Sequence, residues 1–270
     1  MRIHVYSRSF APAIGGMEKL MEVLAGEFIR QGHEVVVVTE TPGEADLPYP
    51  VIRQPGLLDY YRAARDADVI LSAPLSLRRY PAQALSRTPL CIAHPVPFPS
   101  SGRQRLAGQI KSLVSRHVVN IVPSTYMAGH FPAPVVIYNP FDPNALAPKT
   151  VDQDRSNVIF VGRLVPEKGG NVLLEAFARA RAANGARLTV VGDGPQRAAL
   201  ELQADRLGIA DRVRFTGPLR GSEVWAQMRS HRIMVVPSTW EEPFGIVALE
   251  GLACGCRMIV AESGGLPEAV

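Results

Sequence analysis

Short apolar runs rich in β-branched residues alternate with amphipathic segments along most of the chain, and this alternation limits the fold more than any other feature. The runs have the length of strands, whereas the segments between them repeat apolar residues at helical spacing. Strands that alternate with helices form parallel sheets, because each helix returns the chain to the end of the sheet where the next strand begins. We therefore expect an α/β protein built from doubly wound parallel sheets.

The first half of the chain predicts one series of strands and a clear helix over residues 17–30. The strands are expected at residues 2–6, 34–39, 68–72, 89–94, 118–122 and 135–138. A proline-containing segment over residues 139–154 then interrupts the alternation, as is typical of a boundary between domains. We place the boundary so that an N-terminal Rossmann-like domain takes residues 1–147 and a C-terminal one takes residues 148–270.

The second half starts a new series with an apolar run over residues 157–162. Further strands are expected near residues 187–191, 213–216, 233–237 and 256–260, and helices near 170–182, 196–207, 221–228 and 245–253. Two doubly wound domains would face each other across a cleft, and ligands of such sheets bind beyond the carboxyl ends of the strands. The loops with unusual chemistry fall at that end.

The first of these loops, residues 162–169, joins a strand to a helix and carries Arg163 and Lys168. A diphosphate leaving group gains negative charge as its bond to a sugar breaks, and two fixed cations could neutralise that charge without a metal. The alternative is a surface turn whose cations pair with Glu167, and the spacing alone does not exclude it.

The second loop, residues 240–245, follows an apolar strand and opens a helix. The first amides of a helix lack intrahelical partners and carry partial positive charge, so they favour an anion. Amides around Phe244, Gly245 and Ile246 therefore form a candidate seat for phosphate or sugar oxygens.

Two carboxylates flank this helix start, because Glu242 precedes the helix and Glu250 is expected about two turns inside it. One could accept hydrogen bonds from sugar hydroxyls and the other from ribose hydroxyls. The alternative is that Glu242 caps the helix and Glu250 faces solvent. Glu250 lies in an otherwise apolar or glycine segment, and a buried carboxylate requires partners.

The residues from Phe160 to Glu268 closely resemble the family-four retaining glycosyltransferases, also called glycosyl transferases group 1, which have the GT-B fold. The matching motifs are VGRLVPEKG at 161–169, VGDGP at 191–195, FTG at 215–217, PS at 237–238, EPFG at 242–245 with Glu250, and GGLPE at 264–268. Together these motifs are highly specific for the family.

The resemblance implies a role for each matching residue. Arg163 and Lys168 would hold the donor diphosphate, Glu250 would hold the ribose, and Glu242 would face the transferred sugar near the reacting carbon. The main chain at Gly217, Pro218 and Leu219 would border the base.

The N-terminal half matches the family more loosely, as expected of a domain that mainly serves the acceptor. Gly15 and Gly16 resemble the family's glycine loop, where backbone amides approach phosphate or substrate. His94 resembles the active-site histidine that contacts donor-sugar hydroxyls, although a lone histidine at a strand end is more often structural. Asn-Pro-Phe-Asp at residues 139–142 replaces the family's usual Asn-Gly-Val-Asp, so we expect a different hinge turn.

The family resemblance implies transfer with retention of the anomeric configuration and without a metal or another cofactor. We expect a UDP-sugar donor, with GDP or ADP as other candidates, and a glycan, lipid-linked or small-molecule acceptor. Two other functions stay open. A GT-B nucleotide-sugar epimerase should lack the Arg163–Lys168 pair combined with Glu242 and Glu250. A non-catalytic nucleotide-sugar-binding module would be separated from the enzyme by assays of donor hydrolysis or transfer.

The charge distribution singles out residues 69–141, which contain no Asp or Glu. The cations of this segment are Arg78, Arg79, Arg87, Arg103, Arg105, Lys111 and Arg116. They form either a solvated face or a surface for an anionic partner, such as acidic lipid or a phosphorylated acceptor. Residues 103–116 resemble an interfacial helix with an apolar face of Leu106, Ile110, Leu113 and Val114. Nucleic acid is not expected, because no aromatic stacking platform accompanies the cations.

Several features bear on the location and extent of the protein. No apolar run approaches the roughly 20 residues that span a bilayer, no secretory signal precedes the first strand, and Cys91, Cys254 and Cys256 indicate reduced thiols rather than disulfides or a zinc site. We therefore expect a cytoplasmic protein with a peripheral membrane contact as an option. The family's C-terminal domain normally continues beyond the position matching Val270, so we expect an uncovered sheet edge there and leave the activity of this chain open.

Overall fold

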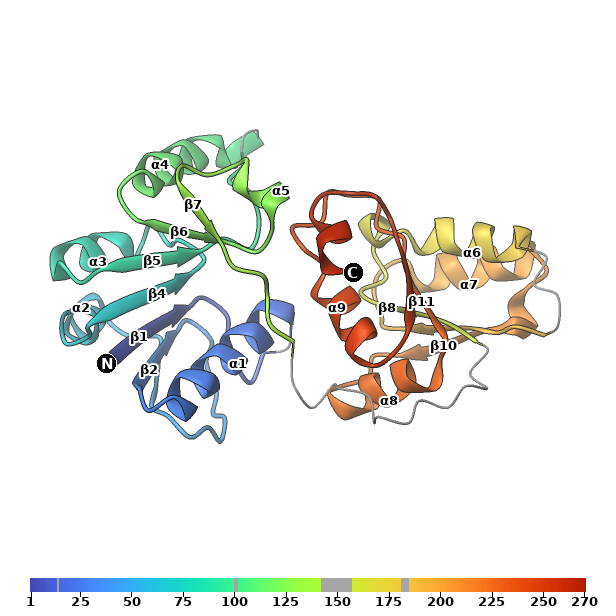
Figure 1. Cartoon of the computed structure of the whole chain (residues 1–270), viewed down its shortest axis with the longest axis horizontal. Helices are drawn as coiled ribbons and strands as arrows, with labels where there is room; N and C mark the ends of the chain where they lie inside the picture. Colours follow the sequence, from blue (N-terminus) through green and yellow to red (C-terminus); the bar gives the residue numbers. More distant parts are fainter. Residues whose placement is uncertain (14, 100–101, 142–156, 181–184) are drawn as a thin grey trace. The chain divides into compact units, whose positions relative to one another are not determined.

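The computed structural model describes residues 1–13, 15–99, 102–141, 157–180 and 185–270 (Figure 1). The chain divides into two compact units, Met1–Pro140 and Phe141–Val270, and each is described by itself. The domain boundary that we expect between residues 147 and 148, and Asp142 of the predicted hinge turn, lie outside the described residues.

The N-terminal unit contains a seven-stranded sheet in which every neighbouring pair of strands is parallel. The strands are β1 Arg2–Ser7, β2 Glu34–Thr39, β3 Val51–Arg53, β4 Val69–Ala73, β5 Leu90–Ala93, β6 Val119–Val122 and β7 Pro134–Val136, in the order β3-β2-β1-β4-β5-β6-β7. The helices are α1 Gly16–Arg30, α2 Leu57–Arg65, α3 Tyr80–Ser86, α4 Arg105–Ser115 and α5 Thr125–Ala128. The short 3-10 turn η1 Gly102–Gln104 precedes α4.

Both faces of this sheet are covered by helices, which explains why its central strands are apolar on both sides. Successive side chains of a strand point to opposite faces. Val35 and Val37 of β2 pack with Met21 of α1, whereas Val38 packs on the other face with Tyr60 of α2.

The C-terminal unit repeats this architecture with a five-stranded parallel sheet. Its strands are β8 Val158–Val161, β9 Leu188–Val191, β10 Val213–Gly217, β11 Ile233–Val236 and β12 Arg257–Val260, in the order β10-β9-β8-β11-β12. The helices are α6 Gly170–Arg179, α7 Arg197–Arg206, α8 Ser222–Ser230 and α9 Ile246–Ala253, with 3-10 turns η3 Pro166–Lys168, η4 Ala210–Arg212 and η5 Leu266–Ala269. α6 and α7 pack on one face of the sheet, and α8 and α9 pack on the other.

Each sheet has one point at which the direction of winding reverses. In the N-terminal unit this point lies between β1 and β4, and in the C-terminal unit it lies between β8 and β11. The loops that leave two such strands diverge to opposite faces, so a crevice forms at their carboxyl ends. The two reversal points are therefore the places in the fold where a ligand site is expected.

The predicted architecture of doubly wound parallel sheets is confirmed, and the strand that we expect at residues 34–39 matches β2. One strand was not predicted, namely β3, which has only three residues. α6 ends at Arg179, before the predicted end at residue 182, and residues 181–184 are outside the described part. Among the described helices, none combines the length and the hydropathy needed to cross a membrane.

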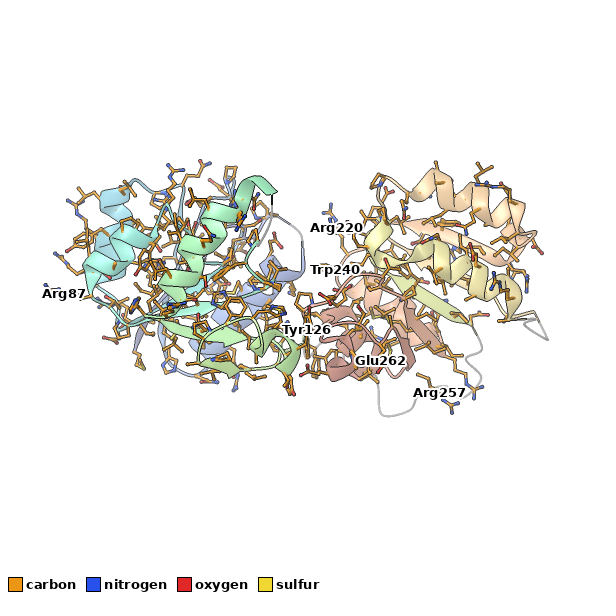
Figure 2. The ribbon with its side chains drawn as sticks, turned by 90° about the horizontal axis from the view of Figure 1, so that it is seen from above. Arg87, Tyr126, Arg220, Trp240, Arg257 and Glu262 are labelled. Atoms are coloured by element: carbon orange, nitrogen blue, oxygen red, sulfur yellow. The ribbon has the colours of Figure 1, made fainter. Side chains whose placement is uncertain are left out.

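The strand β12 forms one edge of the C-terminal sheet. Its residues Arg257 and Ile259 are exposed, and the side chain of Arg257 projects away from the unit in Figure 2. An exposed edge of this kind is a place where a further strand or another element can pair.

Candidate functional site

The loop that follows β8 is held against the loop that follows β11, so the two loops at the C-terminal reversal point form one structure. The amide of Thr239 donates a hydrogen bond of 2.9 Å to the carbonyl of Glu167. Gly169 has a φ of +69°, and a Cβ at this position would lie 2.0 Å from the carbonyl oxygen of Pro237. Only glycine allows this close approach, which fixes the end of the turn that carries Lys168.

Lys168 and Glu242 meet across these two loops. The ammonium of Lys168 lies 2.5 Å from Oε1 of Glu242, and the Ser238 hydroxyl donates to the same oxygen at 2.7 Å. The ammonium also lies 5.6 Å from the ring centroid of Trp240, which is labelled in Figure 2. Glu242 is only 5% exposed, and a buried carboxylate is stable when a cation and a hydrogen-bond donor satisfy it.

This arrangement excludes two of the alternatives that the sequence left open. Lys168 pairs with Glu242 rather than with Glu167, and Glu167 forms no ion pair with any described residue. Glu242 does not cap α9, because the N-cap position is Gly245 and no side chain caps this helix. Both residues are instead placed in the crevice between adjacent strands.

Arg163 lies in the same loop as Lys168, directly beyond β8. Its side chain is exposed and forms no ion pair within the described part of the chain. The structure thus brings Lys168 to the carboxylate and leaves Arg163 available to a ligand. The predicted diphosphate contact of both residues stays a prediction.

The start of α9 has the features of an anion-binding site. Phe244 is buried directly before this turn. Gly245 has a φ of +97°, and a Cβ there would lie 2.3 Å from Cδ1 of Leu266. The first amides of a helix have no intrahelical acceptor, and α9 begins at Ile246. Their positive ends therefore face the loop that holds Glu242.

A third loop, which follows β12, contacts the backbone of Glu242 next to this anion-binding site. The amide of Gly265 donates to the carbonyl of Glu242 at 2.6 Å. A Cβ at Gly264, which has a φ of +60°, would lie 2.3 Å from the same carbonyl oxygen. The loop after β12 therefore positions the backbone of Glu242, and this explains the pair of glycines at 264 and 265.

The remaining predicted donor residues lie on the same unit. Glu250 is half-buried and lies one helical turn beyond Ile246, rather than two turns inside the helix as expected, because α9 begins only at Ile246. Gly217 ends β10 with a φ of +78°, and its carbonyl accepts the amide of Gly192 at 3.0 Å. Pro218 is exposed and Leu219 is half-buried directly after it. Their contacts to ribose and base stay predictions.

The two predicted glycines of the N-terminal unit lie at the beginning of α1. Gly15 occupies the N-cap position and Gly16 is the first helical residue. Neither is involved in a side-chain cap, and both are exposed. Their contact with phosphate or substrate stays a prediction.

His94 directly follows β5, as predicted, but its side chain is almost fully buried. The ring stacks on Phe131 with 3.9 Å between the ring centroids, and its Nε2 lies 2.9 Å from Oδ1 of Asn120. The Asn120 amide nitrogen donates to the carbonyls of Ser115 and Pro132, so Oδ1 is the acceptor and Nε2 carries the proton. Burial lowers the pKa of His94 to about 4, which keeps the ring neutral at pH 7. The predicted sugar contact stays a prediction.

Sequence reasoning assigned no role to Ser238 or Trp240, although both contact the Lys168–Glu242 pair. Ser238 lies in the Pro-Ser motif at residues 237–238, which matched the family but had no assigned role. The hydroxyl fixes one oxygen of Glu242, and the indole ring offers its face to the ammonium. Both residues orient the pair rather than add charge.

Comparison with known proteins identifies the C-terminal unit. Residues 143–270 match the model of a family described as Glycosyl transferases group 1. The D-inositol 3-phosphate glycosyltransferase of Frankia alni is 41% identical over 145 residues, which cover 49% of this chain and 35% of that protein. An uncharacterized glycosyltransferase of Methanocaldococcus jannaschii is 37% identical over 120 residues, or 44% of this chain and 30% of that protein. The chain thus spans only about a third of the length of these curated relatives.

Solved structures extend the similarity to both units. The Anabaena protein HepE in complex with UDP matches 100% of this chain and 83% of that chain, with a TM-score of 0.81 and 23% identity. Sucrose-phosphate synthase from Thermosynechococcus elongatus matches 98% of this chain and 82% of that chain, with a TM-score of 0.76 and 21% identity. At these identities the likeness establishes the fold, and the chain has the two Rossmann-like domains of the GT-B fold.

Proposed function

Residues 143–270 match the family described as Glycosyl transferases group 1, and we propose that the protein transfers a sugar from a nucleotide diphosphate donor to an acceptor hydroxyl. The observation that carries this proposal is the Lys168–Glu242 pair at the reversal point of the C-terminal sheet, beside the amides that open α9. A cation, a carboxylate and free amides in one crevice are what a sugar diphosphate requires.

In this proposal the parts of the donor are divided among the described groups. Arg163, Lys168 and the first amides of α9 bind the diphosphate, since all carry positive charge or a positive dipole end. Glu242 accepts hydrogen bonds from the transferred sugar and Glu250 from the ribose. The main chain from Gly217 to Leu219 borders the base. Because the diphosphate and Glu242 compete for the same ammonium, donor binding exchanges one anionic partner of Lys168 for another.

We propose that the nucleotide of the donor is UDP. The support is that HepE, which shares the fold, was crystallised with UDP and with UDP-glucose. A base bordered by main chain is weakly discriminated, so GDP and ADP are the alternatives to be tested.

For the chemistry we propose retention of configuration without a metal. The acceptor oxygen attacks the anomeric carbon from the side of the leaving group, the bond from that carbon to the phosphate oxygen breaks, and the acceptor proton passes to the departing phosphate. Arg163, Lys168 and the helix amides stabilise the charge that develops on the diphosphate. A covalent intermediate on Glu242 is the less favoured alternative.

Calorimetric and thermal-shift titration of the whole chain with UDP, GDP and ADP in the presence of EDTA tests the proposal. We expect UDP to stabilise the protein by about 2.7 kcal/mol at a hundredfold excess over its Kd, because it binds only the folded state. A requirement for a divalent metal would contradict the metal-independent site, and a failure of every nucleotide to bind would contradict the function.

The same preparation separates the alternative functions through NMR of a UDP-sugar. Release of UDP with formation of a glycoside or free sugar of retained configuration is the expected result. Conversion of the donor to its epimer without an acceptor would identify an epimerase, and binding without any turnover would identify a binding module.

We also propose that α4 contacts an anionic membrane surface. Leu106, Ile110 and Leu113 are 67%, 44% and 58% exposed, and Arg105 and Arg116 flank them at the surface. The fourth residue of the predicted apolar face, Val114, is buried in the core, so that part of the expectation is wrong. Exposed apolar side chains flanked by cations are typical of helices that lie in a membrane interface. A cytoplasmic location stays a prediction.

Cosedimentation with vesicles tests this contact. We expect the chain to bind vesicles of phosphatidylglycerol and phosphatidylcholine, and the double substitution Leu106→Ser and Leu113→Ser to weaken that binding about tenfold or more. The matched control is Leu85→Ser, because Leu85 is 71% exposed on α3 of the same unit. An anionic interface at α4 would be contradicted if Leu85→Ser weakened vesicle binding as much as the double substitution. It would also be contradicted if the unsubstituted chain bound pure phosphatidylcholine vesicles as well as those with phosphatidylglycerol.

A further inference from the structure

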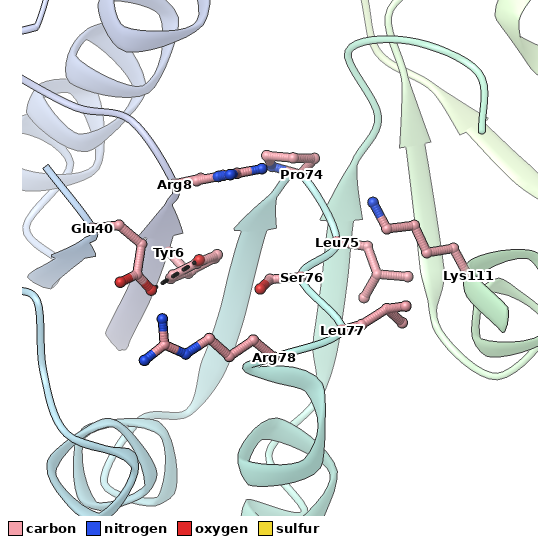
Figure 3. A pocket seen from close by; sticks show the side chains of 9 residues that line it. All are labelled: Tyr6, Arg8, Glu40, Pro74, Leu75, Ser76, Leu77, Arg78 and Lys111. Atoms are coloured by element: carbon pink, nitrogen blue, oxygen red, sulfur yellow. Dashed lines mark hydrogen bonds between the residues drawn. The ribbon is translucent and has the colours of Figure 1, made fainter. Parts of the chain in front are cut away.

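A cavity of about 420 Å³ lies within the N-terminal unit, at the carboxyl ends of its central strands (Figure 3). Arg8 follows β1, Glu40 follows β2, residues 74–78 follow β4, and Lys111 reaches the cavity from α4. β1 and β4 are the strands at which the winding of this sheet reverses, so the cavity occupies the ligand crevice of the fold. Its volume falls within the roughly 300–1,000 Å³ of small-molecule sites.

Glu40, the carboxylate among the described residues that line the cavity, is already neutralised. Oε1 of Glu40 lies 2.7 Å from Nε of Arg79 and 2.7 Å from its Nη2, and it accepts the Tyr6 hydroxyl at 3.3 Å. The guanidinium of Arg79 is only 1% exposed, so it serves Glu40 rather than a ligand. Arg79 therefore does not belong to the positive surface, although the sequence placed it among the cations of residues 69–141.

Three further cations remain around the cavity. Figure 3 shows Arg8, Arg78 and Lys111 on three different sides, with Ser76 between them. None of the three forms an ion pair with a described residue, and residues 69–141 supply no Asp or Glu that could do so. Positive groups in a concave site raise the local potential for anions above that of a flat surface.

The pKa of Lys111 gives independent support for an anion-binding cavity. Burial lowers the pKa of its ammonium, and the positive charge of Arg8 lowers it further. The protein thus holds a cation where both desolvation and a like charge disfavour it. An anionic ligand would offset both effects, whereas a merely solvated surface lysine would experience neither.

We propose that this cavity is the acceptor site and that it selects acceptors carrying an anionic group, a phosphate or a carboxylate, bound by Arg8, Arg78 and Lys111. The Ser76 hydroxyl is the polar partner for one of the acceptor's own hydroxyls. The cavity has room for a substituted monosaccharide. The inference rests on the proposed function in taking the ligand as the acceptor, but the binding needs nothing from the C-terminal unit.

Isothermal titration of the whole chain with glucose 6-phosphate, glucuronate and glucose tests the inference. We expect one or both anionic sugars to bind and neutral glucose to bind at least tenfold more weakly. The affinity for the anionic sugar should fall as salt rises. Arg78→Ala and Lys111→Ala should each weaken it about tenfold or more, because each removes a charge-assisted hydrogen bond. Preference between the two anionic sugars distinguishes phosphate from carboxylate recognition.

The control is Arg116→Ala, which removes the same charge from an exposed position at the end of α4 outside the cavity. The assignment would be overturned if Arg116→Ala weakened binding of the anionic sugar as much as Lys111→Ala does. It would also be overturned if Lys168→Ala abolished that binding while Arg78→Ala did not. Equal binding of glucose and the anionic sugars, or no binding of either anionic sugar, would do the same. We expect the Lys111→Ala variant to bind UDP with unchanged affinity. The titration with anionic sugars therefore tests the acceptor site, and the titration with UDP tests the proposed function separately.

Discussion

Replacement of Lys168 by alanine is expected to lower the turnover of sugar transfer by about 10²–10³-fold. The ammonium is at the reversal point of the C-terminal sheet, where the charge on the departing diphosphate would develop. Since the interaction strengthens as the bond to the sugar breaks, kcat should fall more than KM for the donor rises. Steady-state kinetics with the UDP-sugar identified by titration measure both quantities.

The stability of the same variant separates a catalytic effect from a folding effect. Glu242 keeps the Ser238 hydroxyl when Lys168 is removed, so we expect a loss of only about 1–3 kcal/mol in the free energy of unfolding. Arg163→Ala should slow transfer to a similar extent with no loss of stability, because Arg163 has no ion-pair partner among the described residues. Arg179→Ala, at the exposed end of α6, is the charge-matched control. Wild-type turnover in Lys168→Ala would remove this residue from the mechanism.

Gly169→Ala is expected to destabilise the C-terminal unit by about 3 kcal/mol or more. Part of the loss is the left-handed φ of +69°, which costs a residue with a Cβ about 1 kcal/mol. The larger part is the contact at 2.0 Å that the new Cβ would make with the Pro237 carbonyl, because the loop after β11 would have to shift. That shift would also separate Lys168 from Glu242, so UDP affinity should fall in the same variant.

Gly208→Ala provides the matched control. Gly208 has nearly the same φ, +67°, but a Cβ there meets nothing within 4 Å. The difference between the two variants therefore isolates the contact with Pro237. Both tryptophans of the chain, Trp225 and Trp240, lie in the C-terminal unit, so urea unfolding followed by tryptophan fluorescence reports on this unit alone. Equal destabilisation of the two variants would show that the loop accommodates the side chain.

Periodicity predicted the fold because most strands contain at least four consecutive residues of one pattern. The four valines of β2, residues 35–38, leave no alternative to a strand buried on both faces. β3 was missed because three residues do not establish a period, and its place at the edge of the sheet depends on pairing with β2. The pairing is a tertiary contact that local sequence does not encode.

The site was predicted as a set of residues but not as a set of contacts. The resemblance assigned Lys168 to a diphosphate and Glu242 to a sugar, whereas the structure pairs them with each other across 74 positions of the chain. The burial of Arg79 was also missed, because its neighbour Arg78 is exposed and the two look alike in a sequence. In each case the missing information is which loops lie on adjacent strands and which partner lies across the crevice.

The winding of both sheets has a consequence for synthesis on the ribosome. β1 is made first, and each later strand, from β2 to β7, adds to a free edge of what has already formed; β8 to β12 assemble in the same manner. No strand has to be inserted between two that are already paired. The first unit can therefore complete its sheet once Val136 has emerged, before Val158 opens the second, so a nascent chain need never expose both sets of unpaired strands together.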